Sequence, residues 1–333
     1  MKKIITGLLL TTCLLSSCGK DQKTEIVGGL GSGNNQGQDV NNQNVQLEDS
    51  FQIGDNWGRK FGNKRVLRYE TNQIIKDFAP SVGRAVTFQN KGTAFYIGKH
   101  NGEYLVATNA HVLTNVPFCQ MGPMLSPRFY FEDFADGLYC RQIIGSWKEI
   151  DLAIISLRVS RDQEYFFDRK EEFKFQKSAS VDKFTELVTF GHGEVNNPSY
   201  KLTYDDSSDC KVLSQTNRFR SVLKEDDPLK HKIPSFATGC DISRGDSGSP
   251  VIDKSNGTLL GIIWGTRNKK PLKIKSSAYI HLLSEQNHED IWKYMSFAIP
   301  TKEIFDRVEK SVRNDRMRYK NRLTLQLLFD IRN

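Results

Sequence analysis

The sequence predicts an all-β domain, built as a sandwich or as a pair of barrels. Short runs rich in Val, Ile, Phe, Tyr and Thr recur along the chain, and Gly, Asn, Asp and Pro separate them, which is the pattern of strands joined by turns. No long helical pattern lies between these runs, which argues against alternating strands and helices. We expect strands at residues 81–88, 93–98, 104–108, 140–147, 151–157, 186–191, 259–265 and 277–283.

The N-terminus has the pattern of an export signal. Two lysines precede an apolar run from Ile4 to Leu15, which is shorter than the roughly 20 apolar residues that cross a bilayer. The run leads into Leu-Ser-Ser-Cys, which ends at Cys18 and resembles the lipobox of bacterial lipoproteins. The resemblance implies that residues 1–17 are removed and that an acylated Cys18 anchors the chain in the bacterial cell envelope. Gly19 replaces the retention aspartate of inner-membrane lipoproteins, which favours the outer membrane; an ordinary secretory signal is the alternative.

Residues 18–47 are predicted to form a flexible tether, because they are rich in Gly, Asn, Gln and Asp and contain few apolar side chains. Such a segment cannot bury enough apolar surface to offset the entropy lost on ordering. A lead-in at 48–74 follows it, and structured sequence begins between Glu48 and Glu70.

Four cysteines are expected to form two disulfides. Of the six in the chain, one leaves with the predicted signal and Cys18 would carry lipid, so an even number remains in an exported protein. Three pairings are possible. Closeness in sequence favours Cys119 with Cys140 and Cys210 with Cys240, each loop contributing on the order of 3 kcal/mol through chain entropy. No CxxC pair or histidine cluster accompanies them, so we expect neither a metal nor a cofactor.

The charge of the chain identifies no partner. A formal net charge of +8 is a mild excess over 333 residues, and it favours anionic surfaces only weakly. Because no nucleic-acid-binding motif is present, we expect no nucleic-acid partner, and we expect a monomeric protein.

One helix is predicted near the C-terminus. Thr301 could cap it, and the apolar residues recur at helical spacing, namely Ile304, Phe305, Val308 and Val312. From Leu323 to Ile331, strand and helix patterns compete, and both assignments stay open.

The segment 245–250 reads Gly-Asp-Ser-Gly-Ser-Pro and carries the strongest functional signal. Glycines on both sides of Ser247 let the backbone turn tightly and bring amides close to a ligand. A serine hydroxyl in such a loop needs a base within hydrogen-bond reach, and the base needs an orienting carboxylate.

Two upstream segments supply those partners. Residues 106–113 place small side chains before His111, and Asp151 opens the apolar run 151–155. The order His, Asp, Ser differs from that of α/β-hydrolases and subtilisins. Together with the Ser247 motif, these segments resemble the trypsin-like serine protease family. The resemblance implies a protease domain at 75–312, followed by a basic C-terminal extension at 313–333.

This resemblance implies a fold and a mechanism. The fold is two perpendicular six-stranded β-barrels with the site between them, followed here by the C-terminal helix. Ser247 would attack the scissile carbonyl of a protein or peptide, His111 would accept its proton, and Asp151 would orient the imidazole. The N–H groups of Gly245 and Ser247 would bind the oxyanion. A lipoprotein with this fold that binds peptides without cleaving them is the alternative.

Primary specificity rests on weaker signals. Asp241 lies six residues before the predicted nucleophile, where trypsin carries an aspartate, and a carboxylate there would pair with a substrate Arg or Lys. The strand ending in Trp264 and Gly265 resembles the one that pairs with substrate backbone. Ile263 replaces the histidine of glutamyl endopeptidases, which disfavours cleavage after Glu. Cys240 departs from the spacing in trypsin, so Asp241 could instead be a solvated loop residue.

Residues 26–29 read Ile-Val-Gly-Gly, like the new N-terminus of activated animal trypsins. We reject that interpretation, because the motif lies within the predicted tether and far upstream of His111. Glu25, moreover, is not the basic residue that an activating cut would need.

Overall fold

The computed structural model describes residues 50–53, 59–62, 67–114, 116, 119, 125–194, 197, 199–224, 230–266, 272–275, 295–314 and 317–331. The chain divides into two units, Met1–Gln46 and Leu47–Asn333, and every described residue lies in the second unit. The predicted signal peptide, Cys18, the tether and the strand expected at 277–283 lie outside the described residues.

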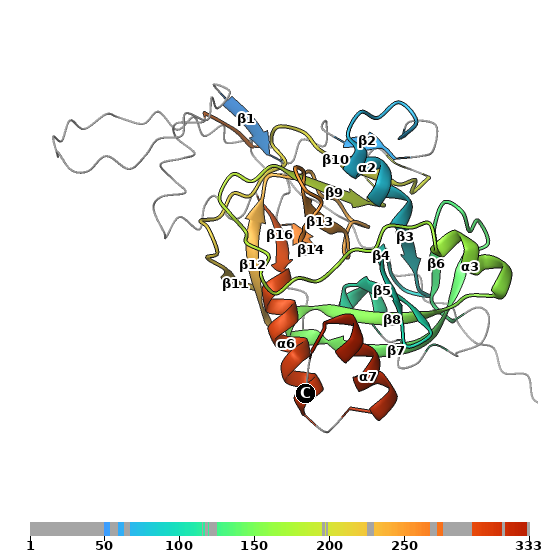
Figure 1. Ribbon diagram of the computed structural model, residues 1–333. Helices are drawn as coiled ribbons and strands as arrows, with labels where there is room; N and C mark the ends of the chain where they lie inside the picture. The colour runs from blue at the N-terminus through green and yellow to red at the C-terminus, as the bar shows by residue number, and fades with distance from the viewer. Residues whose placement is uncertain are drawn as a thin grey trace, which may run out of the picture. The chain divides into compact units, whose positions relative to one another are not determined.

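Six antiparallel strands form a closed barrel in the order β3-β4-β5-β8-β7-β6 (Figure 1). Their bounds are β3 Val82–Val86, β4 Lys91–His100, β5 Glu103–Thr108, β6 Arg128–Tyr130, β7 Leu138–Trp147 and β8 Leu152–Arg158. Successive side chains of a strand point to opposite faces. In β8, Ala153, Ile155 and Leu157 belong to one buried cluster and Leu152 and Ile154 to another. Both faces are therefore buried, which explains why this strand reads as a continuous apolar run.

The second half of the domain is an eight-stranded sheet in the order β11-β12-β16-β14-β13-β9-β10-β2. Its strands are β2 Arg59–Phe61, β9 Leu187–Gly191, β10 Thr203–Asp205, β11 Arg220–Leu223, β12 Lys232–Thr238, β13 Pro250–Asp253, β14 Leu259–Thr266 and β16 Ser296–Pro300. The lead-in strand β2 and strand β11 flank six inner strands. A separate pair joins β1 (Ser50–Ile53) to β15 (Leu272–Lys275). The predicted all-β fold is confirmed. Of the two six-stranded barrels that the resemblance implies, one is a closed barrel of six strands, and the other half is a sheet of eight strands.

Seven of the predicted strands are present. They correspond to β3, β4, β5, β7, β8, β9 and β14, with ends that differ from the prediction by a few residues. The sequence reading gave no strand at β6, β10 or β2, each of which has three residues. Runs this short carry too little periodicity to be recognised without their partners.

Two helices pack at the C-terminal end of the chain, α6 (Thr301–Arg313) and α7 (Tyr319–Leu328). The prediction of α6 is confirmed, and its buried side chains are those expected from the spacing. The predicted Thr301 cap is wrong, because Pro300 occupies the capping position and the Thr301 hydroxyl instead donates to the Leu259 carbonyl at 2.9 Å.

The segment left open between strand and helix forms α7 over most of its length. This helix packs against β4 and β7 of the barrel, and Leu325 and Phe329 are buried in the main core cluster. Two shorter helices complete the described set, α2 (Gln73–Phe78) and α3 (Arg161–Phe167). No helix among the described residues is long and apolar enough to cross a membrane.

Both expected disulfides form. Cys119 bonds to Cys140 in β7, and Cys210 bonds to Cys240, which follows β12. The pairing is the one favoured by sequence separation. The second bond ties the segment after β10 to the start of residues 241–249, the loop that holds the predicted nucleophile Ser247 and is called the nucleophile loop below.

Candidate active site

His111 and Asp151 come together because β5 and β8 are neighbours in the barrel. Thr108 at the end of β5 lies opposite Ala153 near the start of β8, so the flanking residues leave the barrel at the same end. His111 lies in the 3-10 turn Ala110–Leu113 after β5, and Asp151 directly precedes β8. Nδ1 of His111 lies 2.6 Å from Oδ2 of Asp151.

The backbone around Asp151 fixes this geometry. Its Oδ1 accepts the His111 N–H at 2.9 Å, and its carbonyl accepts the Ala110 N–H and the Asn109 side-chain amide, each at 3.0 Å. Asp151 has a φ of 47°, a left-handed conformation that costs energy for most residues and is better tolerated by aspartate. The carboxylate is 1% exposed and the imidazole 30%, so a buried acid orients a partly open ring.

Lys224 is a third partner of this acid, and the sequence reading missed it. Its Nζ lies 3.0 Å from Asp151 Oδ1, with the lysine side chain 17% exposed. Lys224 directly follows β11, so this ion pair links the second sheet to the barrel. Nothing in the sequence around Lys224 distinguishes it among the 47 Lys and Arg residues.

Thr93 attaches the nucleophile loop to the barrel. Its N–H donates to the Ser247 carbonyl at 2.8 Å, and its hydroxyl donates to the Gly245 carbonyl at 3.0 Å. The Thr108 hydroxyl donates to the Thr93 carbonyl at 2.6 Å. This buried residue of β4 therefore fixes the loop relative to the strand that leads to His111. From the sequence, Thr93 was expected only as the first residue of the strand at 93–98.

Glycines allow these close contacts. Gly248 has a φ of +93°, and an added Cβ would collide with the Thr93 carbonyl. At Gly92 an added Cβ would lie 2.8 Å from the Ser247 carbonyl. Side chains at either position would force the nucleophile loop away from β4.

The amides predicted to bind the oxyanion are free of protein partners. Among the described residues, neither the Gly245 N–H nor the Ser247 N–H donates a hydrogen bond, whereas Asp246 between them donates to the Ser243 carbonyl at 3.1 Å. Gly245 has a φ of +100°. Two neighbouring unpaired donors beside a serine form an arrangement that can bind a developing negative charge.

The Ser247 hydroxyl forms no hydrogen bond with His111 within the part of the chain that the structure describes. Ser247 is partly exposed. Catalytic hydrogen bonds are often long in an unliganded site and tighten when substrate binds. The structure thus brings His111 and Asp151 into direct contact and attaches the serine loop to the same barrel through Thr93.

Strand β14 extends beside this loop. Ile263 exchanges backbone hydrogen bonds with Gly248 and Ser249, each at 2.8 Å, so Trp264 and Gly265 continue past the end of β13. The Trp264 indole is buried and donates to the Ser235 hydroxyl at 2.8 Å. Among the described residues, an added Cβ at Gly265 would meet no atom within 4 Å. This glycine lies in the segment expected to pair with substrate.

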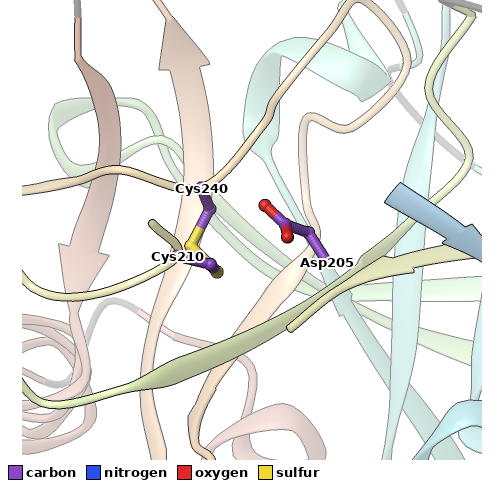
Figure 2. Close-up of side chains that lie close together, drawn as sticks. All are labelled: Asp205, Cys210 and Cys240. Carbon is purple, nitrogen blue, oxygen red and sulfur yellow. A yellow bond between two sulfur atoms is a disulfide. The ribbon is translucent and has the colours of Figure 1, made fainter. Parts of the chain in front are cut away.

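Asp241 is buried, with 4% of its surface exposed, so the alternative of a solvated loop residue is wrong. Its N–H donates to Asp205 Oδ2 at 2.7 Å. Figure 2 shows Asp205 beside the Cys210–Cys240 disulfide. The ligand atoms of these three residues lie within 4.8 Å of one another, but both sulfurs are bonded to each other and offer no thiolate to a metal.

His192 lies behind the nucleophile loop and is fully enclosed. Its ring Nδ1 contacts the Tyr200 carbonyl at 2.8 Å. Its backbone N–H donates to the Thr93 hydroxyl at 3.0 Å. Its buried Nε2 has no partner among the described residues. Burial lowers the pKa of His192 to about 4, against the opposing effect of the Tyr200 hydrogen bond. The imidazole is therefore neutral at physiological pH.

A profile of the trypsin-like peptidase domain matches residues 92–262. An inactive mutant form of Rv3671c from Mycobacterium tuberculosis is similar over 77% of this chain and 97% of that one, with 15% identity and a TM-score of 0.48. The active form of Rv3671c is similar over 74% of this chain and 86% of that one, with 16% identity and a TM-score of 0.47. The HtrA-type protease AlgW with a tripeptide is similar over 73% of this chain and 64% of that one, with 16% identity and a TM-score of 0.46. No curated protein sequence matches the chain.

The profile match begins at Gly92, which lies against the nucleophile loop, and ends in β14, which extends beside that loop. It covers just over half of the chain and includes His111, Asp151 and Ser247. The chain belongs to the family of trypsin-like peptidases.

Proposed function

We propose that this protein is a serine endopeptidase that uses His111, Asp151 and Ser247. The hydrogen bond of 2.6 Å between His111 Nδ1 and the buried Asp151 carboxylate carries the proposal. A carboxylate in this position holds the imidazole with the proton on Nδ1, which leaves Nε2 unprotonated and able to act as a base.

The proposed reaction has two steps. The Ser247 hydroxyl oxygen forms a bond to the scissile carbonyl carbon while its proton passes to His111 Nε2, and Asp151 stabilises the resulting imidazolium. The oxyanion binds to the N–H groups of Gly245 and Ser247. His111 then gives its proton to the leaving amine as the peptide bond breaks, and water hydrolyses the acyl-enzyme in the same way.

A fluorophosphonate probe tests this assignment, because it reacts with an activated serine hydroxyl. We expect modification of Ser247, identified by peptide mass spectrometry, and its loss in Ser247→Ala and His111→Ala. Ser249→Ala is a matched control, because the Ser249 hydroxyl is buried in the same loop and has no hydrogen-bond partner among the described residues. If correctly oxidised protein does not react, the endopeptidase proposal fails and a peptide-binding role is favoured.

We further propose cleavage after Arg or Lys, with Asp241 as the recognising carboxylate. Its position six residues before the serine supports this, because trypsin carries an aspartate there. Matched peptides ending in Arg, Glu or Phe before the cut test it. We expect Arg to be preferred and Asp241→Asn to raise its KM with an unchanged melting temperature. Preference for Phe that Asp241→Asn does not alter would exclude this specificity.

We also propose that Cys18 carries a lipid that anchors the protein in the outer membrane. The Leu-Ser-Ser-Cys sequence after a short apolar run supports the anchor. Metabolic labelling with an alkyne fatty acid should mark the wild-type protein and leave Cys18→Ser unmarked, and membrane fractionation should then find the variant in soluble fractions. Equal labelling of both proteins contradicts the anchor.

A further inference from the structure

We infer that Arg59 is the positioning residue that holds the nucleophile loop in its working conformation, so that the uncut chain is active. Arg59 lies in the lead-in strand β2, outside the barrel and outside the predicted protease domain. Its partner is Asp246, the residue immediately before Ser247. The inference rests on the proposed function, because it concerns the loop that carries the proposed nucleophile.

Arg59 and Asp246 form a buried two-point ion pair. Nη2 of Arg59 donates to Asp246 Oδ1 at 2.9 Å, and Nη1 makes a shorter contact with Oδ2. The arginine side chain is 8% exposed and the aspartate side chain 1%. A planar guanidinium that contacts both oxygens fixes the direction of the carboxylate as well as its position.

Further contacts satisfy the charge on each side. Arg59 also donates to the hydroxyls of Thr203 and Ser243, the latter at 3.3 Å. Asp246 Oδ2 accepts the Ser243 N–H at 2.8 Å. Burial alone would lower the pKa of Arg59, but attraction to Asp246 and the hydrogen bond between them outweigh it and raise the pKa above its ordinary value. The guanidinium therefore stays charged when buried.

The position of Arg59 is set by a sheet. Arg59 lies opposite Asp205 where β2 pairs with β10, and β10 pairs with β9 in turn. Gly193 comes so close that an added Cβ would collide with Asp246 and lie 2.6 Å from Arg59 Nη1. The ion pair thus has little room to shift without moving the sheet.

This pair acts on the proposed chemistry through the backbone. Asp246 stands between Gly245 and Ser247, whose N–H groups are the free donors described above. Without Arg59, a carboxylate that is 1% exposed would lose its counter-ion, and such a charge is costly to keep buried. Turning Asp246 toward water would rotate the peptide groups on both sides of it and move both donors.

The counter-ion comes from the interior of the chain and needs no newly cut terminus. The backbone of Arg59 is paired with β10 in a sheet, and its side chain already supplies the positive charge beside Asp246. Cleavage of the chain should therefore not be needed for activity.

The test compares Arg59→Met with Lys60→Met in purified protein whose mass shows no cleavage after Cys18. Lys60 is the next residue of the same strand, and its ammonium pairs with Asp206 at 2.8 Å with the lysine side chain 53% exposed. We expect Arg59→Met to slow fluorophosphonate labelling of Ser247 by about 100-fold, the size of losing an oxyanion donor, and kcat to fall more than KM rises. Lys60→Met should stay within about twofold, because exposed ion pairs contribute little.

Arg59→Lys keeps the charge but not the two-point geometry, and we expect an intermediate rate. This variant decides the question if Arg59→Met does not fold. Labelling at the wild-type rate by folded Arg59→Met, or by Arg59→Lys when the first variant is unfolded, overturns the inference. So does wild-type protein that reacts only after cleavage. Wild-type protein that reacts neither cut nor uncut contradicts the proposed function instead.

Discussion

The enclosed imidazole of His192 predicts a loss of stability in mild acid. Its Nδ1 is occupied by the Tyr200 carbonyl at 2.8 Å, and its Nε2 is buried without a partner among the described residues. A second proton would have to bind at Nε2, where no acceptor compensates for the charge. Burial, aided by the nearby positive charge of Arg84, lowers the pKa of His192 to about 4 from an ordinary value of 6.5.

The size of the effect follows from this difference in pKa. A shift of one unit corresponds to about 1.4 kcal/mol, so His192 should contribute on the order of 3 kcal/mol to the free energy of unfolding. The native state binds fewer protons than the unfolded state. The contribution is therefore complete above pH 6.5 and is lost as the pH falls toward 4. The free energy of unfolding of a typical protein is about 5–15 kcal/mol, so the contribution of His192 is a large fraction of it.

Urea unfolding of the wild type and of His192→Asn at several values of pH between 7.5 and 4 measures this contribution. The asparagine amide can still donate to the Tyr200 carbonyl but does not titrate. We expect the wild type to lose about 3 kcal/mol more than the variant across this range. Equal losses in both proteins would refute the reasoning, because the acid sensitivity would then come from other groups.

Further substitutions test three other parts of the structure. Gly248→Ala should cost more than about 2 kcal/mol of unfolding free energy and abolish probe labelling, because its φ is +93° and the added Cβ would collide with the Thr93 carbonyl; normal denaturation would contradict this. Asp151→Asn should lower kcat by about 10⁴, the size known for trypsin-like proteases; a near-normal kcat would exclude its proposed role. Phe329→Ala should lower the free energy of unfolding by about 3–5 kcal/mol, because Phe329 is buried. Leu327→Ala should change it by no more than about 0.5 kcal/mol, because Leu327 is 51% exposed. Similar losses in both variants would show that α7 is not part of the core.

Local patterns were enough to predict five of the six barrel strands, all except the three-residue β6, and the proposed catalytic residues. The apolar run of β8 is readable because both of its faces are buried. Helix α6 is readable because its apolar residues keep helical spacing over about two turns, from Ile304 to Val312. His111, Asp151 and Ser247 were found because each lies in a short segment with a specific order of residue types. The structure then showed that β5 and β8 bring the first two into contact.

The residues that were missed depend on contacts across long stretches of the chain. Arg59 and Asp246 are 187 positions apart, and Lys224 contacts Asp151 only because β11 approaches the barrel. Basic residues are common in this sequence, so no local pattern separates these two from solvated ones. Their burial is a property of the assembled sheets.

The C-terminal segment shows a different limit. Leu325 and Phe329 are four residues apart and face the core on one side of α7, where Phe329 stacks on Phe175 at 5.0 Å between ring centroids. The same stretch also alternates apolar residues, which is the strand pattern. Because a ten-residue helix has little intrinsic stability in water, packing against β4 and β7 must decide between the two forms.

Contacts between the barrel and the second sheet position the residues of the proposed site. The barrel carries His111 and Asp151, and Lys224 from the end of β11 pairs with that acid. The nucleophile loop precedes β13 of the second sheet, and Thr93 of the barrel binds it at two carbonyls. One contact thus reaches from the second sheet to the acid of the barrel, and the other reaches from the barrel to the serine loop of the second sheet. A shift of the barrel relative to the second sheet would therefore disturb the acid and the serine loop together. The alignment of the proposed site is therefore set by the same buried contacts that join the halves of the fold.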